Sequence, residues 1–365
     1  AIVTTGDFPG SISIPGTGTS IRISGFVQIN TIYDFDNLGA EELLRNRMIP
    51  LDGSEEDGEE QLRFHARNTR LNVDVRRDTR LGPFRAFVEA DFFGGGEELV
   101  SNYELRLRHG IARLGDFYLG QWWSNFIDIP SRPELNDDGG PLGSPGIRQP
   151  GIRWQRDLEH GWRIGLSLEN PGGDLSGDES ELASDSFPDI IGAAQLTRPW
   201  GRLRIAGLLR RLESKNDDVY VGAVNFTGRI PLRFLGDRDN LSFAVQAGRG
   251  FTRYYGTFTT AGLDGFINNE GNIDPVGGFG GYVAYQHWWS DRLQSNFTFS
   301  FLDLDLPDSA PSDSFDNGIF AEANLFWTPV DDVTMGAGIV YGDREDFNGA
   351  EGSGVRFHGS IRYDF

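Results

Sequence analysis

The sequence predicts an all-β fold, a transmembrane antiparallel β-barrel of about sixteen strands. Three observations predict it: short segments in which apolar and polar residues alternate, connections that are short and long in turn, and a composition too polar for membrane-spanning helices. The alternation is clearest in the last segment, where apolar residues or Gly occupy every second position from Val355 to Phe365. Because successive side chains of a strand point to opposite faces, one face would meet lipid and the other a wet lumen.

The composition is that of an exported barrel protein. Of 365 residues, 38% are hydrophobic and 12% aromatic, and the mean hydropathy is -0.37. No apolar run approaches the roughly 20 residues that a membrane helix needs. The absence of Cys excludes disulfides, thiolate metal sites and Cys nucleophiles. No signal peptide is visible at Ala1, so we expect a mature chain in the bacterial outer membrane whose signal has been removed.

The alternation recurs from the first segment to the last. Each segment has about the 9–11 residues that a tilted membrane strand requires, or somewhat more. We expect strands at 20–36, 61–77, 83–94, 101–114, 115–123, 146–156, 161–170, 188–198, 202–213, 217–230, 238–252, 276–289, 292–305, 315–328, 332–345 and 353–365.

The connections between these strands point the same way. Short ones near 77–83, 114–115, 157–161, 198–202, 290–292 and 329–332 alternate with long ones near 37–60, 123–146, 170–188, 252–276 and 305–315. Short periplasmic turns and long external loops are typical of outer-membrane barrels. We therefore expect a periplasmic N-terminal segment at 1–19 and a barrel at 20–365. The connection at 213–217 is the exception, because it is short although we place it outside.

A soluble all-β protein is the alternative, since its strands also alternate, but it would bury the apolar faces in a core. Aromatic residues near the strand ends favour the barrel, where they would form girdles at the membrane interfaces. These residues are Tyr33, Phe35, Trp122, Trp162, Trp288, Trp327, Tyr341 and Tyr363.

The polar face of the strands assigns a set of charged residues to the lumen. The basic ones are Arg63, Arg67, Arg106, Arg108, Arg148, Arg153, Arg202, Arg204 and Arg356, and the acidic ones are Glu89, Asp91, Glu104, Glu169 and Glu322. The alternation shifts phase within 61–77, which predicts a β-bulge near Asn68–Thr69.

The arginines on 61–77, 101–114 and 146–156 would form one wall of the channel. Guanidinium groups bind carboxylates through two parallel hydrogen bonds and attract anions in a narrow channel, which favours a porin for small anionic solutes. Two alternatives stay open: Arg–Glu pairs that merely keep the lumen wet, and a general or cation-preferring porin. The formal net charge of -21 favours the latter and makes nucleic acid an unsuitable partner.

The connection at 123–146 is the third external loop and contains four Pro and four Gly. We expect it to fold inward as a constriction loop that carries Arg132, Glu134, Asp137 and Asp138 toward the path of the solute. The alternative is an exposed surface loop.

Other sites are weakly indicated. Asp303, Asp305, Asp308 and Asp313 would suit Ca²⁺, which prefers several oxygen ligands, but their spacing matches no EF-hand loop. Calcium at the acidic external loops, with lipopolysaccharide bridged there, is thus the one cofactor candidate. No nucleophile elbow, phosphate loop or clustered Ser/His/Asp site is visible, so we expect no enzyme activity.

Several segments together resemble a known family. They are GDFPGSISIPGTGTSIRISGFVQIN at 6–30, FHARNTRL at 64–71, VEADFFG at 88–94, LRLRHG at 105–110, GQWWSNF at 120–126 and IRQPGIRW at 147–154. They resemble the DcaP-type outer-membrane porins, over nearly the whole chain and most strongly in 6–156.

The resemblance implies a homotrimeric, sixteen-stranded diffusion channel in outer-membrane lipid that takes up dicarboxylates and similar small anions. It would place the solute contacts on Arg63, Arg67, Arg106, Arg108, Arg148 and Arg153. Members of the family can carry an N-terminal coiled-coil stalk, and no heptad run is present here, so we expect a stalk to be absent or removed.

Overall fold

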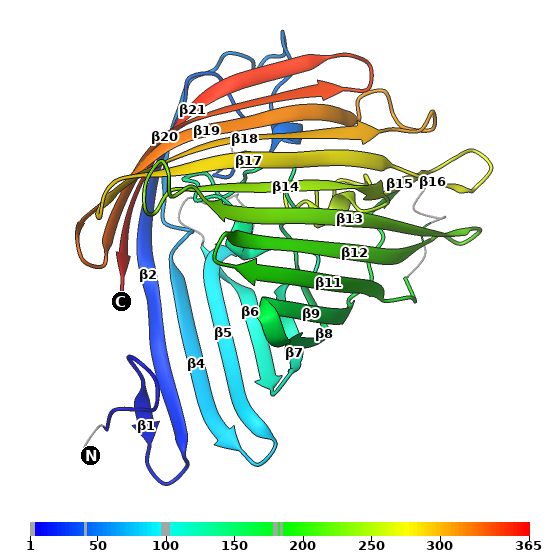
Figure 1. Cartoon of the computed structure of the whole chain (residues 1–365). Coiled ribbons are helices and arrows are strands. Elements are labelled where there is room, and N and C mark those ends of the chain that lie inside the picture. Colours follow the sequence, from blue (N-terminus) through cyan, green and yellow to red (C-terminus); the bar gives the residue numbers. More distant parts are fainter. Residues whose placement is uncertain (1–3, 40–41, 96–102, 178–181, 183–184) are drawn as a thin grey trace.

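The computed structural model describes residues 4–39, 42–95, 103–177, 182 and 185–365. Its main sheet has 18 strands, in which β3 and β4 are two halves of one strand and β1 lies outside the ring, so the barrel has sixteen. Each strand pairs antiparallel with its neighbours, and β21 closes the ring on β2 from Phe26↔Asp364 to Asp34↔Arg356. The predicted fold class is confirmed (Figure 1).

The strands of this sheet are β1 Ile12–Ile14, β2 Thr19–Asp34, β3 Gln61–His65, β4 Arg70–Thr79, β5 Gly82–Gly94, β6 Glu104–Leu114, β7 Phe117–Trp123, β8 Arg148–Asp157, β9 Trp162–Glu169, β11 Asp189–Arg198, β12 Gly201–Glu213, β13 Asp218–Pro231, β14 Asn240–Arg249, β17 Gly277–Ser290, β18 Leu293–Asp305, β19 Phe315–Val330, β20 Val333–Asp346 and β21 Glu351–Asp364. A small second sheet joins β10 Leu175–Ser176, β15 Gly265–Ile267 and β16 Ile273–Pro275. Short 3₁₀ turns lie at Asn46–Met48, Ile129–Ser131, Glu159–Gly161 and Thr252–Tyr254. Residues 101–102, where we expected the strand now labelled β6 to begin, lie outside the described residues.

The predicted phase shift is a bulge between β3 and β4. Strand β2 pairs with β3 at Asn30↔His65 and with β4 at Phe26↔Arg70, so four residues on one strand face three on the other. The extra residue turns the side chain of Asn68 toward the lumen, where it contacts Asn30 and Asp138. Arg67 and Arg70, on either side of the bulge, consequently both carry their charge inside the barrel.

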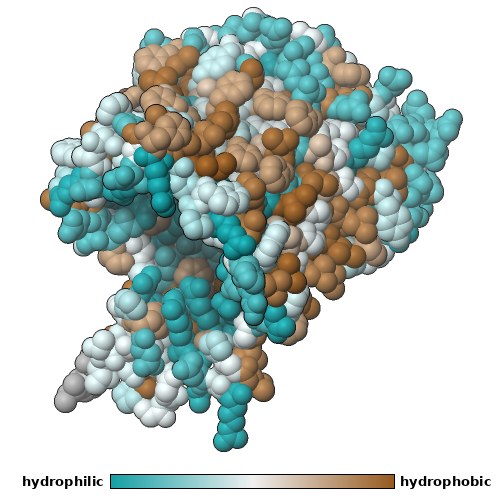
Figure 2. All heavy atoms as spheres, in the orientation of Figure 1, coloured by the Kyte–Doolittle hydropathy of each residue, from teal (hydrophilic) through white to brown (hydrophobic). Residues whose placement is uncertain are grey.

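The outer surface of the strands is apolar. Every second residue is exposed, including Phe64, Leu105, Leu119, Ile205 and Phe297, and Figure 2 shows such side chains gathered over the outside of the strands. Two aromatic residues of the expected girdles face the other way. Trp122 stacks under Arg153 inside the barrel, and Trp288 lines a cavity with Arg70 and Glu134. Both occupy lumen positions in the alternation of β7 and β17.

One part of the sheet extends beyond the ring at the end with the short turns. Residues Thr19 to Gly25 of β2 pair with β4, whereas pairing with β21 begins only at Phe26. Strand β1 covers the edge of β2 that β21 leaves free, from Ile12↔Ile21 to Ile14↔Thr19. The described part of the N-terminal segment therefore lies at this end, where β1 stands beside the lower end of β2 in Figure 1.

The hydrophobic core lies inside the barrel and is built by loops. We name the connection 35–60 L1, 124–147 L3 and 250–276 L6. Leu44 and Ile49 of L1, Phe126 of L3 and Phe258 of L6 are all almost fully buried in one cluster with Phe320 of β19. Arg210 of β12 helps to hold L6 there, because its guanidinium binds both Asp264 of L6 and Asp189 of β11, at 2.8 and 3.1 Å.

Within the described residues, no helix has the length and apolar character needed to cross a membrane.

Candidate functional site

Loop L3 lies inside the barrel against the wall formed by β11 to β21. Near its start, Asp128 binds Arg202 of β12 and Thr227 of β13. Near its middle, the backbone N–H of Asn136 donates to Glu322 of β19 at 2.7 Å. The N–H of Leu142 then donates to Ser300 of β18 at 3.0 Å.

The strongest anchor of L3 is a buried ion pair with the last strand. Arg356 donates to Asp137 at 2.9 Å and also to Asp34 of β2, and all three side chains are fully buried. Asp137 in turn accepts the backbone N–H of Leu44, which ties L1 to L3. Glu322 and Arg356, assigned to the lumen from the sequence, therefore hold L3 in place.

L3 occupies one side of the lumen, so the other side, formed by β3 to β8, borders the path that remains. Four arginines gather there, and we name Arg70, Arg106, Arg108 and Arg148 the arginine wall. Arg148 lies close enough to the other three for their charges to act on it, and Arg70 and Arg108 act on each other.

Two members of the arginine wall have carboxylate partners from β5. Arg106 binds Asp91 through two hydrogen bonds of 3.0 and 2.7 Å, and Arg108 binds Glu89 and Asp91 at 2.7 and 2.6 Å. The side chain of Arg108 is 8% exposed, whereas that of Arg106 is 40% exposed. Arg106 can therefore reach a passing solute more readily than Arg108.

Arg148 has a different environment. Its guanidinium lies over the ring of Trp123, 4.1 Å from the ring centroid. Among the described residues, no carboxylate forms an ion pair with it, and its Nε has no hydrogen-bond partner. The positive charge of Arg148 is therefore held in place by an aromatic ring without being neutralised.

The loop side of the path carries a negative charge. Asp138 of L3 accepts a hydrogen bond from Asn68 at 2.6 Å and lies 3.8 Å from the guanidinium of Arg70. Its side chain remains 49% exposed. A carboxylate on L3 thus stands opposite cations on the barrel wall, which creates an electric field across the part of the lumen between L3 and this wall.

The remaining residues that sequence analysis singled out are placed as follows. Arg67 binds Glu42 of L1 at 3.1 Å, and Arg63 binds Asp34 of β2 at 2.6 Å, so both are paired with carboxylates. Arg153 of β8 stacks on Trp122 and donates to the carbonyl oxygen of Trp123 at 2.7 Å. Arg132 turns back onto its own loop and donates to Gly140 at 2.9 Å.

Glu104 is exposed at the first position of β6, beside the backbone of Gly94 and Gly95. It shares a face of β6 with Arg106, two residues along, but forms no ion pair with another described residue. The structure thus brings Arg106, Arg108 and Arg148 together and leaves Arg63 and Arg132 apart from them. Arg70 and Asp138 complete the group, although Arg70 was not among the predicted solute contacts. Its position on the polar face of β4 was the signal for it.

The candidate calcium site does not form. No group of three or more His, Cys, Asp or Glu side chains within the described part of the chain could hold a metal ion, and that part includes Asp303, Asp305, Asp308 and Asp313. Asp303 and Asp305 are two residues apart on one face of β18, and strand geometry separates such side chains by about 7 Å. Asp305 instead lies 3.5 Å from Arg249.

Comparison with known proteins identifies the family. The family model described as DcaP outer membrane protein matches residues 7–365, nearly the whole chain. The chain belongs to the DcaP family. It is therefore a porin of the bacterial outer membrane. The predicted family resemblance and the predicted location are both confirmed. A search of curated proteins finds no match.

Solved structures of DcaP and other porins share the fold. The outer membrane channel DcaP of Acinetobacter baumannii has a TM-score of 0.86 at 20% identity, covering 97% of this chain and 99% of that one. An anion-selective porin from Comamonas acidovorans has a TM-score of 0.63 at 12% identity, covering 95% and 100%. The trimer form of OmpT from Vibrio cholerae has a TM-score of 0.56 at 10% identity, covering 95% and 100%.

Proposed function

We propose that this DcaP-family porin passes small anionic solutes by passive diffusion and that dicarboxylates are among them. The observation that carries the proposal is Arg148, a guanidinium in the lumen that no described carboxylate neutralises and that three further arginines surround. In a channel narrowed by L3, such a group lowers the energy of an anion and raises that of a cation.

The arginine wall supplies contacts of graded strength. Arg148 forms no ion pair with a described carboxylate, Arg106 is exposed but is paired with Asp91, and Arg108 is largely enclosed. A dicarboxylate can exchange one carboxylate contact for the next as it moves, which suits conduction because serial weak sites release what they bind. No chemical step is needed, and we propose that the protein catalyses no reaction.

We also propose a homotrimer. The apolar outer faces of the strands are suited to packing against another barrel as well as against lipid. A porin of the same fold, the OmpT of Vibrio cholerae, has a trimer form. Cross-linking of the protein in native outer membranes, followed by electrophoresis, checks this proposal: a trimer band supports it and monomers alone contradict it.

The test for the solute class is current block by succinate in planar bilayers. We expect succinate to interrupt the current of the wild-type channel, and Arg148→Gln to shorten the interruptions about tenfold, as loss of a charge-assisted contact would. Arg249→Gln is the matched control, because Arg249 lies at the rim of the barrel and its side chain is 66% exposed. Uninterrupted current in the presence of succinate contradicts the proposal.

A cation-preferring porin is the second candidate. Glu42, Glu89, Asp91 and Asp138 lie among the lumen arginines and offset much of their charge, and the whole chain carries a formal net charge of -21. Ion selectivity separates the two candidates, since it depends on the charge that remains along the path.

A further inference from the structure

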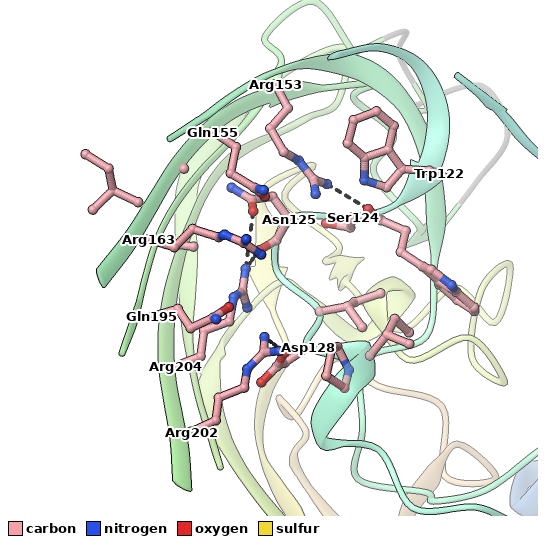
Figure 3. Close-up of a pocket in the computed structure, with 17 residues that line it drawn as sticks. Trp122, Ser124, Asn125, Asp128, Arg153, Gln155, Arg163, Gln195, Arg202 and Arg204 are labelled. Carbon is pink, nitrogen blue, oxygen red and sulfur yellow. Dashed lines mark hydrogen bonds and ion pairs between the residues drawn. The ribbon is translucent and has the colours of Figure 1, made fainter. Parts of the chain in front are cut away.

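A cavity of about 230 Å³ lies between the first residues of L3 and the inner wall of the barrel. Figure 3 shows Arg153, Arg163, Arg202 and Arg204 pointing into it from β8, β9 and β12. Arg163, Arg202 and Arg204 lie close to the turns 158–161 and 199–200, and Arg153 lies in the middle of β8, whereas Arg148 lies at the end of β8 away from these turns. The cavity is therefore on the short-turn side of the constriction.

The cavity is distinct from the arginine wall. The charges that act most strongly on Arg153 are those of Glu169 and Arg204, while those acting on Arg148 belong to Arg108, Arg106 and Arg70. Asp128 is the one carboxylate among the described residues that line the cavity. An anion in the cavity would therefore meet a second group of cations, separate from the first.

Several buried N–H groups in the cavity lack a hydrogen-bond partner. Arg204 is 7% exposed and uses Nη2 to bind the carbonyl oxygen of Asn125, but its Nη1 has no partner. The Nε groups of Arg153 and Arg202 are also without partners. Buried donors are almost always satisfied in proteins, so a water molecule or a solute oxygen that enters the cavity would find these donors available.

The other surfaces of the cavity define what the ligand resembles. Gln155 and Gln195 add amide groups next to the arginines, and Ile127, Ile129 and Pro130 of L3 supply an apolar side. A space lined by cations on one side and by alkyl groups on the other fits a small carboxylate with a short apolar body.

We propose that this cavity is a second anion site, which holds small carboxylates on the short-turn side of the constriction. The inference rests on the proposed function in one respect: the channel must let small carboxylates reach the cavity. Binding itself depends on Arg204 and its neighbours, so the site can be tested whether or not the channel prefers anions.

The direct test is to soak crystals of the full-length protein in bromoacetate, a carboxylate whose bromine is located by anomalous scattering. This chain has no Cys for it to alkylate. We expect a bromine peak in the cavity of the wild type, and its loss in Arg204→Gln. Because Arg204 contacts L3, Arg163→Gln serves as a second variant: Arg163 lines the cavity but binds Asp157, outside the loop.

The control is Arg156→Gln. Arg156 lies on the same strand as Arg153, but its own side chain is 57% exposed and binds Asp116. This variant should keep the bromine peak. A wild-type cavity without a peak would overturn the inference, even in a channel that proves anion-selective. A peak in a cation-selective channel would keep the site and refute the proposed function.

A measurement in solution tests whether the carboxylate binds only at the high concentration used in crystals. Butyrate added on the short-turn side should interrupt the current, with dwell times about tenfold shorter in Arg204→Gln and Arg163→Gln than in the wild type. Arg156→Gln should match the wild type. Equal dwell times in all four proteins would overturn the inference.

Discussion

Arg356 of the last strand and Asp137 of L3 form an ion pair with N–O distance 2.9 Å, and neither side chain is exposed to solvent. The pair joins the closing strand of the barrel to the loop that narrows its lumen. Because Asp34 of β2 shares Arg356, the seam between β2 and β21 and the position of L3 depend on the same guanidinium.

Replacing Arg356 with Gln should release L3 and destabilise the protein. Removing one partner of a buried ion pair leaves the other charge uncompensated and costs about 3–5 kcal/mol. We expect a larger single-channel conductance and a lower denaturant midpoint. The control is Arg249→Gln, which breaks the exposed pair with Asp305 and should cost at most about 1 kcal/mol. Equal effects of the two substitutions would show that the buried pair is not the anchor.

Gly143 of L3 should tolerate no side chain. A Cβ at this position would lie 2.0 Å from the carbonyl oxygen of Phe301 and 2.3 Å from the backbone N of Gly281, so the loop would have to move off the wall. We expect Gly143→Ala to cost about 1–3 kcal/mol and to raise the conductance. Gly192→Ala is the control, because a Cβ there meets nothing within 4 Å. A wild-type conductance in Gly143→Ala would mean that L3 does not lie against β17 and β18.

The position of L3 should withstand mild acid. Burial alone raises the pKa of Asp137, but the imidazole of His358, 3.8 Å away, and the charge of Arg356 outweigh it and hold the pKa well below the ordinary value of 3.8. A carboxylate with a lowered pKa stabilises the fold above its unfolded pKa, and this stability is lost only as the pH falls through the folded pKa. The conductance should therefore stay constant from about pH 7 to about pH 4.5. A reversible rise in conductance within that pH range would refute the anchoring of L3 by Asp137 and Arg356.

Asp138 should oppose the anion preference. Its carboxylate is 49% exposed and faces the arginine wall, so Asp138→Asn removes a negative charge from the path without breaking a buried ion pair. A unit charge about 4 Å away in water is worth about 1 kcal/mol, so the anion-to-cation permeability ratio should rise by up to about fivefold. Asp305→Asn, at the rim, should leave the ratio unchanged. An unchanged ratio for Asp138→Asn would place this carboxylate outside the path.

The barrel could be predicted from the sequence because each strand carries its own signal. Side chains alternate between lipid and lumen, so the pattern around Val355 to Phe365, or the phase shift at Asn68–Thr69, reports local structure directly. The same rule assigned Arg106 and Arg108 to the lumen and would also have found Arg163, which shares its face of β9 with Glu169.

The interior of the barrel could not be predicted in this way. L1 and L6 have no periodic pattern, so nothing local showed that Ile49 and Phe258 would meet in one buried cluster. A lumen-facing charge also does not reveal its partner: Arg356 and Glu322 hold a loop, whereas Arg148 faces the path. That distinction depends on contacts between residues far apart in the chain.

The measurement that tests the central claim most directly is the reversal potential in a KCl gradient, compared between the wild type and Arg148→Gln. We expect an anion-selective wild type and a variant with clearly weaker anion preference, because Arg148 is the member of the arginine wall that forms no ion pair with a described carboxylate. A cation-selective wild type, or a variant with unchanged selectivity, would contradict the role given to the arginine wall.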